Sequence, residues 1–573
     1  MPVHNSEISG LLERMADLLE IKNANPFRVR AYRNAARVIG GLPRAVTAML
    51  DEGEKLSELP GIGERLEKKI EGIARSGKFP ALEKIEKSIS PDLIDLLSLP
   101  HLGPKRVRSL HDRLGVDTLP DLEKAVAEHR LGTVRGFGAK LEHDLAASLR
   151  LREGRTRRFK LSVVQDIADS LVSHLAAAPE MGRVVVAGSV RRRRETVGDL
   201  DLLVTARDST AIMERFVSYD EVRGVLGRGS TRCTVVLRSG LQVDLRVVPA
   251  ESYGAALQYL TGSKAHSVAL RALAVKHGLK LNEYGVFRGP QRIGGASEPE
   301  VYGALGLPYI EPELRENTGE IEAAREGRLP RLITPADIRG DLHAHTNETD
   351  GVATLEEMAD AASARGYEYL AITDHSQRMA MAHGLDAKRL AVQMQRIDRL
   401  NGRLRGITLL KGCEVDILED GSLDLPDEIL RDLDLTVCSV HSRFTLSREK
   451  QTERILRAMD HPGFRIWGHP TGRLLEVREP CDLDLEKLLR AARERGCFVE
   501  LNSQPDRLDL DDVHCRLARE LGVQVSIASD AHRTGELDFM RYGLGQARRG
   551  WLEATNVLNT KRLPELLRRL RRG

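Results

Sequence analysis

The spacing of apolar residues separates the first half of the chain into two stretches of different character. Residues 5–150 carry apolar positions at helical spacing, broken by short turns with Gly or Pro, which predicts a region of short helices. From residue 183 the pattern changes to runs rich in β-branched residues that predict strands: RVVVAGS, DLDLLVT, CTVVLRSG and LQVDLRVV. The last two flank Ser239-Gly240 and are expected to form a β-hairpin.

The last part of the chain alternates strands with helices. After residue 338, helical segments such as 354–365 and 485–495 alternate with the short apolar runs YLAIT, ITLLKGCEV, LTVCSV, CFVELN and VQVSIAS. This alternation predicts an α/β domain, and a barrel is the expected form. The charged, Pro-containing segment before it lacks periodicity, which predicts a linker.

Composition narrows the class of protein. The chain has 573 residues, of which 41% are hydrophobic and 30% charged, so several soluble globular domains are expected. Its first residues have no basic region followed by an apolar core, which argues against a secretory signal, and no apolar run is long enough for a membrane span. The six cysteines never form CxxC, so we expect neither a zinc knuckle nor a disulfide framework. The expected location is the reducing cytoplasm. The net charge is only +3, but residues 1–310 are mildly basic, which is permissive for contacts to DNA phosphates and does not diagnose them.

The first candidate site is a pair of aspartates on one strand. Asp199 and Asp201 are two residues apart, so their carboxylates share a face, which is costly without a cation. Asp244 on the expected hairpin could supply a third carboxylate, and such a set suits two Mg²⁺ or Mn²⁺ ions that bind substrate phosphates. A DxD pair alone is more often a solvated strand edge. The turn Gly188-Ser189 upstream, which offers N–H groups to a triphosphate, favours the metal site.

These segments resemble the X family of DNA polymerases. The resemblance rests on GSVRRRRETVGDLDLLV, VDLR and YLTGSKAHSVALRALA. It implies metal binding and catalysis by the three aspartates. It also implies contacts to the incoming nucleotide or the template by Gly188, Ser189, Arg192, Tyr259, Thr261, Gly262, Lys264 and Arg271.

Two positions depart from the eukaryotic pattern of that family, and one cluster has a simpler explanation. Leu260 replaces an aromatic residue, which leaves the strictness against ribonucleotides open, and Lys264 resembles bacterial members, where a lysine helps to bind nucleotide. A solvated lysine at a helix start is the alternative for Lys264. Arg191 to Arg194 form a charged face from which one or two contacts to phosphate are expected.

Three turns in the helical region have the form of helix-hairpin-helix motifs. They are LPGIG at 59–63, LPHLG at 99–103 and the degenerate VRGFG at 134–138. Gly61, Gly63 and Gly103 would expose backbone N–H groups that bind DNA phosphates without reading sequence. A plain helix-loop-helix is the alternative for any single turn. Residues 6–80 resemble the small N-terminal domain of X-family polymerases, in which Lys69 matches a lyase lysine; a contact to a 5′-phosphate is the alternative.

The second candidate site is a set of histidines and carboxylates at strand ends. In α/β barrels catalytic residues gather at the carboxyl ends of strands, and imidazole with carboxylate suits two or three Mn²⁺, Zn²⁺ or Fe ions. One histidine near a strand end is usually structural, but repeated placement is hard to explain in that way. The expected ligands are His343, His345, Asp350, His375, Glu414, His441, His469, Asp530 and His532.

This set resembles the polymerase-and-histidinol-phosphatase (PHP) domain, with every motif position filled by an expected ligand type. Thr349 stands where Ser is common. The resemblance implies metal-dependent hydrolysis, with His343 and Asp530 as catalytic residues. An X-family polymerase followed by a PHP domain is the order found in bacterial X-family repair polymerases.

The fold expected from these resemblances is multidomain. A helical helix-hairpin-helix region is followed by an α+β nucleotidyltransferase domain with palm and thumb, and then by an α/β PHP barrel. The expected boundaries are 1–85 for the helical N-terminal domain, 86–158 for the second helix-hairpin-helix region, 159–312 for palm and thumb, 313–337 for the linker and 338–573 for the PHP domain.

The expected function is gap filling by a DNA polymerase in base excision repair or end repair, with a 3′→5′ exonuclease in the PHP domain. Cleavage at abasic sites and removal of 3′-phosphates are compatible additions. Two alternatives remain: a PHP phosphatase for small molecules, and a DNA-end-binding scaffold with relic sites. The expected partners are duplex DNA with gaps or 3′ ends and dNTPs, without a membrane, and a monomer is expected.

Overall fold

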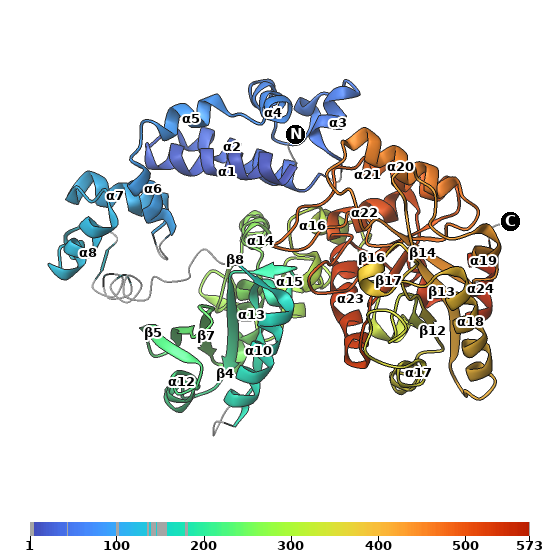
Figure 1. The fold of residues 1–573 in the computed structure, drawn as a ribbon. Helices are drawn as coiled ribbons and strands as arrows, with labels where there is room; N and C mark the ends of the chain where they lie inside the picture. Colours follow the sequence, from blue (N-terminus) through green and yellow to red (C-terminus); the bar gives the residue numbers. More distant parts are fainter. Residues whose placement is uncertain are drawn as a thin grey trace. The chain divides into compact units, whose positions relative to one another are not determined.

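The computed structural model describes residues 5–42, 44–98, 102–134, 137–138, 142, 145, 158–177 and 182–571. The chain divides into two compact units, Met1–Glu326 and Gly327–Gly573 (Figure 1). This division lies within 313–337, the segment expected to be a linker. Part of that segment forms helix α16 (Glu320–Arg325), whose side chains Glu320 and Ile321 are buried in the first unit. Among the described residues, no helix is long and apolar enough to span a membrane.

The first unit begins with short helices around one apolar core, as the helical spacing predicts. Figure 1 shows the two longest lying side by side. Leu12, Met15 and Ile39 are among the fully buried core residues. The helices are α1 (Asn5–Ile21), α2 (Pro26–Gly40), α3 (Val46–Asp51), α4 (Glu64–Ser76), α5 (Pro80–Glu86), α6 (Pro91–Asp95), α7 (Pro104–Leu114) and α8 (Leu119–Ala127).

Two of the predicted hairpin turns lead directly into helix N-termini. In the first turn Gly61 has φ +80°, a conformation that favours glycine, and Gly63 is the residue before α4. Gly103 holds the same position before α7, where Pro104 takes the first helical position. Residues 99–101 of the second turn, and 135–136 of the third, lie outside the described residues.

A five-stranded sheet with the order β2-β4-β7-β6-β5 forms the next part of the first unit. β4 and β7 are parallel, and the other neighbours are antiparallel. The expected hairpin at Ser239-Gly240 joins β6 to β7 and is confirmed. The strands are β2 (Val184–Val186), β4 (Asp199–Thr205), β5 (Val222–Arg228), β6 (Arg232–Leu237) and β7 (Gln242–Val248), and a two-stranded pair is formed by β1 (Phe159–Lys160) and β3 (Thr196–Val197).

One local expectation in this region is wrong. Gly188-Ser189 does not end a strand, because β2 stops at Val186 and these residues begin the short helix α11 (Gly188–Arg191). Gly188 has φ +61°, which turns the chain out of the sheet. A Cβ at Gly188 would lie 2.2 Å from Asp201 Oδ2, so only glycine fits there.

The first unit also contains further helices and a small three-stranded antiparallel sheet that the sequence pattern did not indicate. They are α10 (Leu161–Ala176), α12 (Thr210–Val217), α13 (Tyr253–Thr261), α14 (Lys264–Lys276), α15 (Glu298–Ala304), β8 (Lys280–Asn282), β9 (Gly285–Arg288) and β10 (Gln291–Gly294).

The second unit is a parallel barrel, as predicted. Its seven strands follow one another in chain order. A parallel bridge between Ala344 and Ala531 joins the segments that follow the first and last strands. The strands are β11 (Gly340–Asp341), β12 (Tyr369–Ile372), β13 (Thr408–Asp416), β14 (Leu435–Ser439), β15 (Ile466–Trp467), β16 (Phe498–Asn502) and β17 (Val525–Ala528).

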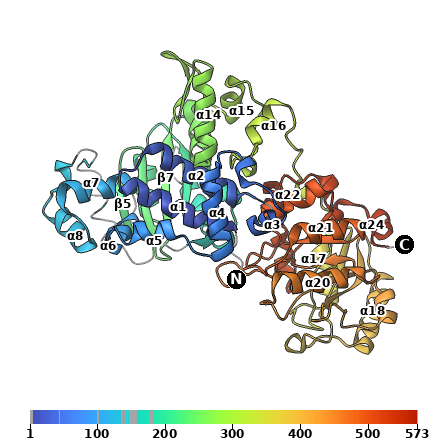
Figure 2. The ribbon, with the colours of Figure 1, turned by 90° about the horizontal axis from the view of Figure 1, so that it is seen from above.

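Amphipathic helices surround these strands (Figure 2). The helix predicted at 354–365 begins with a capping box between Thr354 and Glu357, and the helix predicted at 485–495 ends one residue early. The helices are α17 (Leu355–Ala364), α18 (Ala387–Asn401), α19 (Asp427–Arg431), α20 (Arg448–Asp460), α21 (Leu485–Glu494), α22 (Asp512–Leu521), α23 (Met540–Arg549) and α24 (Leu563–Leu570).

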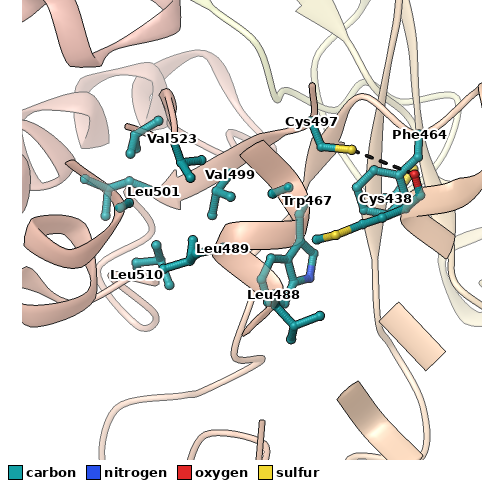
Figure 3. Packing of buried hydrophobic residues seen from close by; sticks show 14 of the residues in the cluster. Cys438, Phe464, Trp467, Leu488, Leu489, Cys497, Val499, Leu501, Leu510 and Val523 are labelled. Carbon is teal, nitrogen blue, oxygen red and sulfur yellow. Dashed lines mark hydrogen bonds between the residues drawn. The ribbon is translucent and has the colours of Figure 1, made fainter. Parts of the chain in front are cut away.

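The main core of this unit lies between the strands and α20–α22. Trp467 at the end of β15 is fully buried, and its indole lies beside Leu488, Leu489 and Cys438 (Figure 3). Leu488 and Leu489 lie on α21 and are also fully buried. Their close packing against the strands holds α21 on the barrel.

Leu488→Ala is expected to lower the free energy of unfolding of the second unit by about 2–5 kcal/mol, because the substitution leaves a cavity against the indole of Trp467. Both tryptophans of the chain, Trp467 and Trp551, lie in this unit. Tryptophan fluorescence during urea unfolding of the full chain therefore monitors this unit alone. Val392→Ala is the control, since Val392 is 55% exposed. Equal midpoints for the two variants would contradict the assigned packing.

Candidate metal centres

The first site brings together the three aspartates predicted from the sequence. Asp199 and Asp201 lie on β4, and Asp244 on the neighbouring parallel strand β7 pairs in register with Asp201. Asp244 accepts hydrogen bonds from Thr234 Oγ1 at 2.5 Å and from Arg232 Nη2 at 2.9 Å. The three carboxylates therefore share one end of the sheet.

The electrostatics of this end of the sheet favour a cation. Burial, followed by the charges of Asp199 and Asp244, raises the pKa of Asp201 to about 8. Burial and the charge of Asp244 also raise the pKa of Asp199. Like charges on neighbouring strands are stable when a divalent cation neutralises them, so the residues present fit one.

Two of the four consecutive arginines are held by ion pairs in this structure. Arg191 forms two hydrogen bonds with Glu298, at 2.9 and 2.6 Å, and a third to Thr261 Oγ1 at 2.7 Å. Arg192 pairs with Glu316 at 3.0 Å and donates to the carbonyl oxygen of Thr261. The end of α11 is thereby tied to the end of α13, where the nucleotide contacts were expected.

The remaining predicted nucleotide contacts surround that junction. Gly262 has φ +68° and follows α13, and the exposed Lys264 begins α14. Tyr259 is 38% exposed, and the Arg271 guanidinium lies 5.9 Å from the centre of its ring. Ser189 is half-buried on α11.

In the helical region, Lys69 lies on α4 and its Nζ is 2.5 Å from the hydroxyl of Tyr32 on α2. The ammonium also lies 5.1 Å from the centre of the Tyr32 ring. The structure therefore gives Lys69 a defined neighbour, and the two sequence-based explanations of this lysine both stay predictions.

The second site collects the nine predicted ligands of the C-terminal unit around the carboxyl ends of the barrel strands. His343 and His345 follow β11, Glu414 lies near the end of β13, and Asp530 and His532 follow β17. His375, His441 and His469 follow β12, β14 and β15, and Asp350 lies on the loop after His345. Parallel strands in chain order bring these ends to one mouth of the barrel.

Glu414 lies at the centre of this cluster. Its Oε1 is 2.8 Å from His469 Nε2 and 3.2 Å from His441 Nε2. Its Oε2 is 3.0 Å from His375 Nδ1 and 3.4 Å from His343 Nε2. His345 Nε2 is 3.6 Å from Oε2, so one buried carboxylate lies close to five imidazoles.

The remaining ligands extend the cluster on two sides. His343 Nε2 and His345 Nε2 are 3.1 Å apart, and Asp530 Oδ1 lies 3.2 Å from His345 Nε2. Asp350 Oδ2 lies 3.2 Å from His375 Nε2 and 3.4 Å from His532 Nε2. Converging nitrogen and oxygen atoms at such distances fit metal ions held between them.

Three groups in the described chain have ligand atoms that all lie within 4.8 Å of one another. All three belong to the C-terminal unit, and the aspartates of the first site are not so tightly gathered. The groups are His345, Asp350, His375 and His532; His343, His345 and Asp530; and His375, Glu414 and His441.

The charges of this cluster are balanced between carboxylates and imidazoles. Burial opposes ionisation of Glu414, but His375, His441 and His343 hold its pKa well below the usual range. Burial lowers the pKa of His375, yet Glu414 and Asp350 outweigh it and raise that pKa to about 10. Burial and the nearby His532 lower the pKa of His345 to about 4. When no metal ion is bound, protons on the imidazoles balance the charges of the carboxylates. Metal ions would displace these protons on binding.

Several supporting residues were missed by the sequence reasoning. Glu500 Oε1 lies 2.6 Å from His343 Nδ1, and Asp416 Oδ1 lies 3.3 Å from His441 Nδ1, so each orients the opposite nitrogen toward the cluster. Asn502 donates to Asp530 Oδ2 at 3.0 Å. A charged residue inside an apolar strand, as in FVELN and CEVD, is the signal that could have found them.

Comparisons with known proteins agree with both halves of this arrangement. Family models match for a helix-hairpin-helix domain over residues 3–79, a tandem helix-hairpin-helix over 93–151, the DNA polymerase beta thumb over 256–316 and the PHP domain over 341–504. The DNA polymerase/3′-5′ exonuclease PolX of Bacillus subtilis (strain 168) is 36% identical over 575 residues, which cover 100% of both chains. The chain belongs to the PolX family. The resemblances to X-family polymerases and to the PHP domain are therefore confirmed.

The second unit is also similar to proteins without the first. A probable phosphatase of Thermoanaerobacter sp. (strain X514) is 32% identical over 232 residues, which are 38% of this chain and 89% of the relative. A probable phosphatase of Acetivibrio thermocellus is 33% identical over 206 residues, which are 34% of this chain and 80% of the relative. In this PolX family member the PHP domain is joined to a polymerase-type unit.

Asp201→Asn is expected to stabilise the metal-free first unit at pH 8.5, by roughly 2–4 kcal/mol, and by much less at pH 5. Because the folded-state pKa of Asp201 is raised, to about 8, the stability that its protonation supplies is present below pH 4 and is lost as the pH rises through 8. An asparagine cannot ionise and escapes this loss.

Calorimetry of the full chain in EDTA measures this change in stability. The unfolding transition of the first unit is recognised because it leaves tryptophan fluorescence unchanged. Addition of Mg²⁺ should stabilise the wild-type protein and not the variant. The exposed Asp220→Asn serves as the matched control. Parallel pH profiles of Asp201→Asn and the wild type would show that the carboxylates do not repel one another.

Proposed function

We propose that this protein is a DNA-repair polymerase that fills short gaps with its first unit and trims 3′ ends with its PHP domain. The observation that carries the proposal is the presence, on one chain, of two separate sets of metal-ligand side chains. The aspartates of β4 and β7 form one set, and the strand-end residues of the barrel form the other. Similarity to a DNA polymerase/3′-5′ exonuclease over the full length supports both activities.

In the polymerase unit, Asp199, Asp201 and Asp244 would hold two Mg²⁺ or Mn²⁺ ions. The backbone N–H groups at the start of α11 and the Ser189 hydroxyl would bind the triphosphate. Arg192 would exchange its ion pair with Glu316 for a phosphate contact. Divalent cations, when bound, supply Lewis acidity that activates a hydroxyl or water nucleophile and neutralises phosphate charge.

Other residues of the unit would position the nucleotide and the DNA. Tyr259, Thr261 and Gly262 would lie against the sugar, Lys264 would face the nucleotide, and Arg271 would contact the template strand. The glycine turns before α4 and α7 would bind backbone phosphates of the duplex through their N–H groups. These contacts suit a gapped duplex without a preferred sequence.

In the PHP domain, the three groups of ligands would hold two or three Mn²⁺, Zn²⁺ or Fe ions. Glu500 and Asp416 keep His343 and His441 in the orientation that directs their Nε2 atoms to the cluster. Asn502 fixes one oxygen of Asp530 and leaves the other to face His343 and His345. Because the PHP domain is joined to a polymerase, which works on DNA 3′ ends, its proposed substrate is the phosphodiester at such an end.

Asp199→Ala with Asp201→Ala is expected to reduce primer extension at least about 100-fold and to leave 3′ trimming unchanged. His343→Ala or Asp530→Ala should give the reverse, because each change removes ligands from one site only. The substrate is a gapped duplex with a mismatched 3′ end, incubated with Mg²⁺ or Mn²⁺.

Asp220→Ala and His461→Ala are the matched controls. Asp220 is exposed, and His461 pairs with Asp427 away from the ligand groups. Full extension by the double aspartate variant would refute the polymerase assignment. Persistent trimming by both His343→Ala and Asp530→Ala would refute the hydrolytic one.

A second candidate for the PHP domain is hydrolysis of a small phosphomonoester. The observation that favours it is the similarity of residues in this domain to relatives named probable phosphatases. Turnover of p-nitrophenyl phosphate by the full chain, compared with turnover of oligonucleotide 3′ ends, separates the two. We expect the oligonucleotide to have the higher kcat/KM.

A further inference from the structure

Arg507 lies on the loop after strand β16, at the edge of the PHP ligand cluster. Its Nε atom is 4.0 Å from Asp530 Oδ2. The guanidinium therefore stands beside Asp530, one of the ligands of the cluster.

The guanidinium of Arg507 does not donate hydrogen bonds to its neighbours among the described residues. A separation of 4.0 Å is too long for a hydrogen bond to Asp530. The nearer partners of that carboxylate are Asn502 at one oxygen and His345 at the other, at 3.0 and 3.2 Å. Within the part of the chain that the structure describes, the Arg507 side chain makes no hydrogen bond, and it is 22% exposed. Its donors are thus available at the mouth of the barrel.

The loop that carries Arg507 is fixed at its base. Asn502 and Asp509 exchange backbone hydrogen bonds of 2.6 and 3.2 Å. The Asp509 carboxylate accepts the N–H groups of Thr471 and Gly472, both at 2.9 Å. Arg473 donates to the carbonyl oxygen of Leu508, next to Arg507. A side chain on so firmly held a loop can bind a ligand with little loss of backbone entropy.

We propose that Arg507 binds a non-bridging oxygen of the phosphate group on which the PHP domain acts. A guanidinium offers several N–H donors in a plane and matches phosphate better than a lysine does. A phosphate brings further negative charge to a cluster that already holds Asp350, Glu414 and Asp530. A fixed positive charge beside Asp530 would offset part of that repulsion. The proposal rests on the hydrolytic function proposed above and names a residue that would bind its substrate.

The test uses inorganic phosphate as the probe and the metal-loaded full chain as the protein. Isothermal titration calorimetry should show phosphate binding roughly 10- to 100-fold weaker in Arg507→Gln than in the wild type, with an intermediate value for Arg507→Lys. Metal content should be equal in all three proteins. Arg457→Gln is the control, because Arg457 is 57% exposed and pairs with Glu453 on the outer helix α20.

Trimming of an oligonucleotide supplies the second readout. In Arg507→Gln the KM for the 3′ end should rise while primer extension stays unchanged. Phosphate affinity within twofold of the wild type overturns the proposal. Loss of metal from both Arg507→Gln and Arg507→Lys also overturns it, since Arg507 would then only support Asp530.

The substrate source and the parent function are separated by two further comparisons. A larger loss of affinity for a 3′-phosphorylated oligonucleotide than for free phosphate identifies DNA as the ligand, and an equal loss identifies a free phosphate. If the wild type trims no DNA while Arg507→Gln still weakens phosphate binding, the nuclease function fails and the Arg507 site stands.

Discussion

The contact on which the PHP domain depends is that of the buried Glu414 carboxylate with five imidazoles. A buried charge is stable only when opposite charges and hydrogen bonds compensate it, and here the compensation comes from residues after β11, β12, β14 and β15. The strands that flank β13 must therefore end at the same level as Glu414. The register of the barrel strands therefore fixes the geometry of the ligands, because moving any of these strand ends by one residue would turn its histidine away.

The polymerase-type unit meets a similar problem with different means. Its carboxylates lie on two neighbouring strands, where burial and then their mutual repulsion raise the pKa values of Asp199 and Asp201. Arg232 donates to Asp244, whereas Arg191 and Arg192 are paired with Glu298 and Glu316. Those glutamates hold the two guanidinium groups at the end of α11 and the end of α13, so positive charge is held on the same short helix whose first N–H groups are proposed to bind the triphosphate. Metal ions thus have a larger share of the charge balance here than in the barrel.

Much of this architecture could be predicted from the sequence, and the exceptions have physical reasons. The barrel strands, the hairpin at Ser239-Gly240 and the strand-end position of the histidines follow from local patterns of apolar and polar residues. β5 was missed because its glycines and arginines hide the strand pattern. The partner of Arg192 is 124 residues away, and Glu500 is 157 residues from His343. Such pairings depend on tertiary contacts that no local pattern contains. Gly188 was misassigned because strand periodicity gives no sign of a positive φ.

Closure of the barrel by Ala344 and Ala531 determines when the PHP domain of the nascent chain can complete its ligand cluster. His345 donates its backbone N–H to Ala531 at 2.8 Å, and Asp530 donates to the carbonyl of His343 at 3.0 Å. The two ends of the PHP domain therefore meet inside the ligand cluster. During translation the polymerase-type unit emerges first and can fold, whereas the hydrolytic centre lacks its last ligands until nearly the whole polypeptide has left the ribosome. A chain that is cut short loses its means of degrading DNA before it loses its means of building it.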